Sequence, residues 1–216
     1  MKNEIIPISL GNVKVYLIKG EKWVLVDTGF AFSYKMMLKA MEKHQINPED
    51  ISLIIITHNH LDHVGGLVKL QKLTNAKVLI HRFDGEDLRN GISSVVKPVK
   101  ILAKIIFKLF HGKHVTFEPH IEIDGDMDLS EFGLSGKIIH TPGHTPGSVS
   151  ILLDNGDCII GDLISGNKKK AKLFYVIDDI NELKSSLKKL IQLGAKRFYT
   201  SHAKVCDVEA VEKLLD

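Results

Sequence analysis

The sequence predicts an α/β (α+β) protein built from two halves, each a β-sheet with helices, that pack together as a layered sandwich. Strand-like and helix-like segments alternate in both halves of the chain, with hairpins among them. At 216 residues, of which 44% are hydrophobic and 25% charged, the chain can bury a large core without disulfides. No low-complexity linker interrupts it, so we expect a single domain over residues 1–216.

The first half begins with strand-like segments. Val13, Val15 and Leu17 alternate with more polar neighbours, and residues 23–26 form a short apolar run. The expected elements that follow are a helix from Ser33, its N-cap, to about Gln45, an apolar strand at 53–56, a helix at about 64–73 and a strand at 77–80. This order predicts a sheet with helices packed on it.

The second half repeats the style. We expect strands at about 137–139, 149–153, 158–160 and 198–200, and a helix at 181–193. The segment 154–157, Asp-Asn-Gly-Asp, is typical of a hairpin turn between two of these strands. A second sheet with its own helix is therefore expected.

Between the halves, residues from about 95 to 112 predict an amphipathic helical insertion. At about 100° per residue, the side chains of Lys97, Lys100, Lys104 and Lys108 fall within an arc of about 80°, opposite the apolar residues. Pro98 suits a first helical turn. We expect the apolar face to pack on the domain. The alternatives are a lid over an apolar substrate, self-association, or a membrane-surface contact through residues 97–110.

The charge balance favours a small-molecule substrate. With 29 Lys and Arg against 26 Asp and Glu, the net charge is only +3, whereas a dedicated nucleic-acid binder needs a basic stripe. The first ten residues lack the apolar core of a signal peptide, and no apolar run reaches about 18 residues, so a cytoplasmic location is expected. The chain has 11 His and only 2 Cys, so a metal site would need nitrogen and carboxylate ligands.

The segment most informative about function is His58-Asn59-His60-Leu61-Asp62-His63, which directly follows the apolar strand at 53–56. Neutral imidazoles and ionised carboxylates are the ligands that Zn²⁺ takes when thiolates are absent. In extended chain His58 and His60 point the same way and can share one ion. A turn after them would aim Asp62 and His63 at a second ion. The alternative is a histidine-rich loop in which Asp62 caps the next helix.

This motif resembles the His-x-His-x-Asp-His signature of the metallo-β-lactamase superfamily, and the resemblance extends from the Asp27-Thr28-Gly29 turn to His202. It implies a four-layer αβ/βα sandwich. The later ligands implied by the family pattern are His144 in Thr141-Pro142-Gly143-His144-Thr145-Pro146-Gly147, Asp162 and His202. Composition alone does not choose between His140 and His144 in that loop; the family pattern selects His144.

The resemblance implies a dinuclear centre. His58, His60 and His144 would hold the first ion, Asp62, His63 and His202 the second, and Asp162 and a hydroxide would bridge them. Asp27 is expected to hold a ligand histidine in its tautomer.

Such a centre implies hydrolysis of an ester, thioester, lactone or similar small substrate, as in glyoxalase II or lactonase-like enzymes. Asp62 and Asp162 are the candidate catalytic residues, able to orient the nucleophile or carry a proton. Two divalent ions are expected, zinc first, with iron or manganese as alternatives.

The departures from the family pattern leave the subfamily open. Asp162 stands where β-lactam-hydrolysing members often have Cys, little chain follows His202 for a glutathione-gripping region, and Ser165 replaces a lactonase Tyr. The alternative activity is that of a mononuclear non-haem iron oxidoreductase of the persulfide dioxygenase type.

Overall fold

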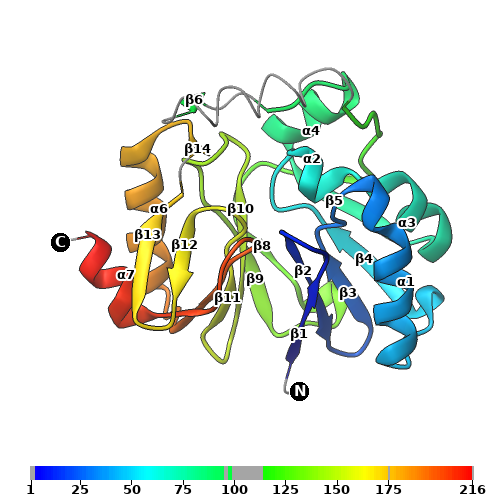
Figure 1. Cartoon of the computed structure of the whole chain (residues 1–216), viewed down its shortest axis with the longest axis horizontal. Helices are drawn as coiled ribbons and strands as arrows, with labels where there is room; N and C mark the ends of the chain where they lie inside the picture. The colour runs from blue at the N-terminus through cyan, green and yellow to red at the C-terminus, as the bar shows by residue number, and fades with distance from the viewer. Residues whose placement is uncertain (1–2, 95–96, 99–113, 175, 216) are drawn as a thin grey trace.

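The computed structural model describes residues 3–94, 97–98, 114–174 and 176–215. Two six-stranded sheets lie face to face, and helices cover the outer face of each sheet (Figure 1). The expected four-layer αβ/βα sandwich is confirmed. Within the described residues, no helix has the length and apolar character needed to cross a membrane.

The first sheet has the strand order β1-β2-β3-β4-β5-β7. Its strands are β1 (Glu4–Ser9), β2 (Lys14–Lys19), β3 (Trp23–Val26), β4 (Ile51–Ile55), β5 (Lys77–His81) and β7 (Ile121–Ile123). The first three pair antiparallel, and β3, β4, β5 and β7 pair in parallel. The helices that follow its strands are α1 (Tyr34–Lys43), α2 (Leu61–Val64), α3 (Leu67–Thr74) and α4 (Arg82–Arg89).

The second sheet has the order β16-β15-β11-β10-β9-β8. Its strands are β8 (Met127–Asp128), β9 (Gly136–His140), β10 (Val149–Leu153), β11 (Asp157–Ile159), β15 (Arg197–Tyr199) and β16 (Cys206–Asp207). The expected hairpin joins β10 and β11, and Gly156 takes a positive φ of 86° in its turn. Helices α6 (Ile180–Gln192) and α7 (Val208–Leu215) belong to this half, and β12 (Ile164–Asn167) pairs with β13 (Lys170–Leu173) as a separate hairpin.

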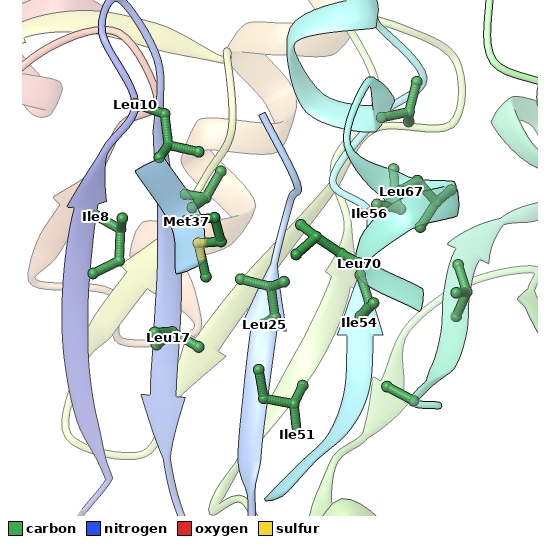
Figure 2. Close-up of a cluster of buried hydrophobic side chains, with 14 of the residues drawn as sticks. Ile8, Leu10, Leu17, Leu25, Met37, Ile51, Ile54, Ile56, Leu67 and Leu70 are labelled. Atoms are coloured by element: carbon green, nitrogen blue, oxygen red, sulfur yellow. The ribbon is translucent and has the colours of Figure 1, made fainter. Parts of the chain in front are cut away.

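Three apolar layers hold these elements together. Leu25 and Ile54 point outward and pack with Met37 of α1 and Leu70 of α3 (Figure 2). The alternate residues of the same strands point the other way and, with side chains of the second sheet, fill the space between the sheets. A third cluster lies between the second sheet and helices α6 and α7. Strands buried on both faces explain why 53–56 is apolar throughout.

The helix expected at about 64–73 is present as α3 but begins later, at Leu67, because Gly65 and Gly66 separate it from the short helix α2. A Cβ at Gly65 would lie 2.5 Å from the Leu61 carbonyl oxygen, and one at Gly66 would lie 2.5 Å from the Thr28 carbonyl oxygen. The two glycines therefore let the turn after β3 pack against the start of α3. This break makes α2 a separate short helix.

Two further expectations differ from the structure. Ser33 is at the N-cap of α1 as expected, but its buried hydroxyl makes no capping hydrogen bond within the described residues, because Ser33 also closes a 3₁₀ turn over Ala31–Ser33. Of the insertion expected at about 95–112, residues 95–96 and 99–112 lie outside the described part. Lys97–Pro98 form a short strand, β6, that pairs with β14 (Val176–Ile177).

Candidate metal centre

All seven residues expected to bind metal lie at the carboxyl ends of strands. His58 and His60 follow β4, Asp62 and His63 lie on α2, His144 lies between β9 and β10, Asp162 follows β11, and His202 follows β15. They form two groups, His58–His60–His144 and Asp62–His63–Asp162–His202. Within each group, one ligand atom from every residue lies within 4.8 Å of the others. Each group takes residues from both halves of the sandwich.

In the first group, three imidazoles turn a ring nitrogen toward one point. His144 Nε2 lies 3.1 Å from His58 Nε2 and 3.0 Å from His60 Nδ1. The other nitrogen of His144, Nδ1, donates to the Val176 carbonyl oxygen at 2.7 Å. In a neutral ring, Nε2 then carries the lone pair.

The same reasoning identifies the tautomer of His58. The Thr57 hydroxyl donates to Asp27 Oδ2 at 2.8 Å, so it can accept from His58 Nδ1 at 3.0 Å. His58 Nε2 therefore also carries a lone pair, and it faces the lone pair of His144. Two lone pairs at 3.1 Å repel unless a cation or proton lies between them.

In the second group, imidazoles meet carboxylates. His202 Nε2 lies 3.0 Å from Asp62 Oδ2 and 3.2 Å from Asp162 Oδ2, and His63 Nε2 lies 3.7 and 3.6 Å from the same two oxygens. Each ring is again fixed through Nδ1. His63 donates to Asp27 Oδ2 at 2.8 Å, and His202 donates to the carbonyl oxygen of Asn12 at 2.7 Å. Asp27 thus has the tautomer-holding contact expected of it.

One oxygen joins the two groups. Asp162 Oδ2 lies 4.0 Å from His58 Nε2 and 3.8 Å from His144 Nε2, in addition to its contacts with the second group. The other oxygen, Oδ1, is buried without a hydrogen-bond partner among the described residues. Asp162 therefore has the position that a carboxylate shared by two ions would need.

The electrostatics of the first group favour neutral imidazoles. Burial lowers the pKa of His58 well below its usual value, lowers that of His60 to about 3, and lowers that of His144. These rings are neutral near pH 7, which is the protonation state that a metal ligand requires.

In the second group, charges on neighbouring residues outweigh burial. Although burial opposes the shift, Asp162 and Asp62 raise the pKa of His202 to about 12, and Asp27 with the same two carboxylates raises that of His63 well above its usual value. Burial also opposes ionisation of the two acids, but His63 with His202 lowers the pKa of Asp62 to about 2. His202 and His63 lower that of Asp162 well below its usual value. The ionised carboxylates match a cation, and the donor set of nitrogen and oxygen fits a divalent one.

His140 is the other histidine of the loop that carries His144. It lies outside both groups: its ring stacks on His81 at 3.9 Å between centroids, and its Nε2 lies 2.9 Å from the Pro146 carbonyl oxygen. The family pattern thus chose the histidine that the structure brings to the centre.

Asp84, at the start of α4, was not anticipated. Its buried carboxylate accepts hydrogen bonds from Asn59 N, Thr145 Oγ1 and Gly147 N. Burial raises its pKa to about 6 against these hydrogen bonds, so the group is an acceptor-only carboxylate above that pH. A polar helix without apolar periodicity gave no sequence indication of this role.

Comparison with known proteins agrees with this geometry. The family model of the metallo-beta-lactamase superfamily matches residues 8–202. The chain belongs to the metallo-β-lactamase superfamily. The fold and the two clusters of candidate ligands indicate that this superfamily member binds divalent metal.

Curated relatives support this membership. A probable metallo-hydrolase of Methanocaldococcus jannaschii is 30% identical over 89% of the chain and 88% of its own length. A beta-lactamase-like protein 2 homolog of Caenorhabditis elegans is 28% identical over 97% of the chain, which spans 63% of that relative. Among solved structures, TTHA1623 in a di-iron-bound form superimposes with a TM-score of 0.72 at 22% identity, over 97% of the chain and 98% of that protein. At that identity the superposition shows a shared fold.

Proposed function

We propose that this metallo-β-lactamase-superfamily protein is a dinuclear metal-dependent hydrolase that cleaves an ester, thioester, lactone or similar small substrate. The observation that carries the proposal is the meeting of both ligand groups at Asp162 Oδ2, which lies within 4.0 Å of imidazole nitrogens from each group. Such an arrangement suits two ions at a short separation better than one ion. The near-neutral charge of the chain favours a small-molecule substrate over a nucleic acid.

Divalent ions held here would supply Lewis acidity and lower the pKa of water, so that a nucleophile exists near neutral pH. The chain's own groups then have distinct tasks. Asp162 is buried at 4% exposure and can orient the nucleophile through Oδ1, which has no hydrogen-bond partner in the described part of the chain. Asp62 is 22% exposed and ionised, so it could accept the proton that the nucleophile releases and pass it on to the leaving group.

Phe174 gives the site an apolar boundary. Its ring is 5% exposed and lies 5.4 Å from the ring of His202 and 5.5 Å from that of His144, between centroids. This ring contacts a histidine from each group and limits the access of bulk water on that side. Exclusion of water strengthens the electrostatic interactions within the site.

Metal content and hydrolysis test the proposal together. We expect the purified protein to carry close to two divalent ions per chain, zinc before iron or manganese, and to hydrolyse at least one member of a panel of thioesters, lactones and esters. His58→Ala and Asp162→Ala should each lose metal and hydrolysis. His44→Ala, which changes an exposed histidine at the end of α1, is the matched control and should retain both.

Elemental analysis that finds one iron per chain, with oxygen consumption on thiol substrates, would contradict the proposal and support the dioxygenase alternative. Full metal content in the Asp162→Ala variant would contradict the shared-carboxylate arrangement.

A further inference from the structure

Helix α4 contributes none of the seven candidate ligands, yet one of its side chains contacts both loops that carry the first group. Asp84 Oδ2 accepts from Asn59 N at 2.7 Å and from Thr145 Oγ1 at 2.9 Å. Asn59 stands between His58 and His60 in the sequence, and Thr145 follows His144. A single buried carboxylate therefore bonds to the chain immediately beside all three ligands of the first group.

The second oxygen of Asp84 strengthens the same connection. Oδ1 accepts from Gly147 N at 2.9 Å, so the carboxylate holds the loop after His144 at two points. The residue is 1% exposed, and a Cβ added at Gly147 would collide with Asp84 Oδ1. The close approach of the glycine backbone thus leaves the carboxylate one position. The three partners are all donors, and an ionised carboxylate, which only accepts, matches them without leaving an O–H group unpaired.

The loops that Asp84 joins belong to different sheets. His58 and His60 follow β4 of the first sheet, and His144 lies between β9 and β10 of the second. A backbone hydrogen bond from Val149 N to the Thr57 carbonyl oxygen joins the loops at their base, at 2.9 Å. Asp84 joins them again at the level of the ligands themselves.

Asp27 plays the equivalent part for the second group. Its carboxylate accepts from Thr57 N at 2.8 Å and contacts His63 Nδ1 at 2.8 Å. Asp27 also accepts from Thr57 Oγ1, the hydroxyl that contacts His58 Nδ1, so it supports one residue of the first group as well.

We propose that Asp84 is a positioning residue for the first metal group: it sets the separation between the His58–His60 loop and the His144 loop, and so the distance between their imidazoles. The inference rests on the proposed metal-binding function. His144 Nε2 lies within 3.1 Å of a ring nitrogen of both His58 and His60, and these three nitrogens form an ion site only if both loops are held in register. Loss of Asp84 should weaken the first group selectively and leave the second group, held by Asp27, in place.

Cobalt(II) titration of the metal-free protein tests this, read by visible absorption and by competition with a chelator. Wild type should take up two ions in two resolvable steps, with His144→Ala and His202→Ala assigning the steps to the first and second groups. Asp84→Asn keeps the side-chain size but turns an N–H₂ donor toward backbone N–H groups. We expect it to weaken the first-group ion by about 10- to 100-fold and to change its cobalt spectrum, with the second-group affinity unchanged.

Glu86→Gln is the matched control, because it neutralises an exposed acid on the same helix and should reproduce wild type. If Asp84→Asn lowers only the melting temperature and leaves both affinities and both spectra unchanged, Asp84 is merely structural and the inference is wrong. If that variant does not fold, Thr145→Val decides: it removes one of the three hydrogen bonds to Asp84, along with the contact between the Thr145 and Ser148 hydroxyls, and should weaken the same step by a smaller factor. Wild type that binds no cobalt would overturn the proposed function itself, and the role of Asp84 with it.

Discussion

His60 differs from the other four histidines of the centre in the atom that it turns inward. It presents Nδ1 to His144, whereas His58, His63, His144 and His202 all present Nε2. The remaining nitrogen of His60 is buried without a hydrogen-bond partner in the described residues. Four of the five rings are thus oriented by a contact at the nitrogen that faces away from the centre. The fifth, His60, has only its backbone position between β4 and α2 to orient it.

The opposite pKa shifts of the two groups predict different pH dependences of metal binding. His202 and His63, whose pKa values are raised, are protonated at neutral pH in the metal-free protein and must each release a proton to bind an ion. The first-group histidines, whose pKa values are lowered, are already neutral. We expect the second-group affinity to fall about tenfold per pH unit for each proton released between about pH 8 and pH 6, while the first-group affinity changes little.

Competition with a chelator at a series of pH values measures both affinities. In His202→Ala, any affinity left at the second group should depend less steeply on pH than in wild type. Equal pH dependence of the two steps would contradict the prediction.

At this scale the sequence predicts the candidate ligands and one of their supports, Asp27, but not the other supports. The spacing of His58, His60, Asp62 and His63 is local, so it can be recognised in the chain. The contacts of His202 with Asn12 and of His144 with Val176 join residues 190 and 32 positions apart, and use backbone oxygens that any residue could supply. Only the folded chain reveals them.

The β1–β2 hairpin supports the segment that carries His202. Tyr16 on β2 donates its hydroxyl to the Thr200 carbonyl oxygen at 2.7 Å, and Lys14 N donates to the Ser201 carbonyl oxygen at 2.8 Å. The turn of the same hairpin supplies the Asn12 oxygen that fixes His202. An element without a candidate ligand therefore positions one from the other sheet.

Tyr16→Phe should lower the free energy of unfolding by about 1–2 kcal/mol, because it leaves the buried Thr200 carbonyl without this donor while the ring stays in place. Urea unfolding followed by circular dichroism measures the change. Tyr34→Phe, which alters a half-buried ring at the start of α1, is the control and should stay within about 0.5 kcal/mol of wild type. Equal stability of all three proteins would show that the hydroxyl contributes nothing.

Among the elements, the apolar strands were the most predictable. β3, β4 and β10 are buried on both faces and coincide with apolar runs. Helix α4 escaped prediction because its sequence, RFDGEDLR, is mostly polar and buries only Asp84, Gly85 and Leu88. The break between α2 and α3 also has a tertiary cause, the packing of the Thr28 carbonyl oxygen against Gly66.

At the scale of the whole molecule, the centre lies across the boundary between the halves. His58, His60, Asp62 and His63 come from the first sheet's side, and the other three candidate ligands come from the second. Bound ions would therefore link the two sheets directly, beside the apolar layer between them.

Removal of metal should lower the stability of the whole fold. An ion that binds only the folded chain raises the free energy of unfolding by about 2.7 kcal/mol when its free concentration is one hundred times its dissociation constant. We expect a chelator to lower the melting temperature and re-addition of metal to restore it. His58→Ala, which removes a candidate ligand, should show a smaller change in melting temperature than wild type, and His44→Ala should show the full change. A melting temperature that stays the same when the chelator is added would contradict the prediction.

The hydrogen bond between the Asn12 carbonyl and His202 has a consequence for how the protein is made. During synthesis, residue 12 leaves the ribosome long before residue 202, so the Asn12 carbonyl has no partner ring until the 190 residues that follow it have been made. Contacts of such long sequence separation form late and slowly. We therefore expect the His58–His60 pair to bind metal only weakly on the nascent chain. Tight metal binding should begin only when the two sheets of the sandwich pack together.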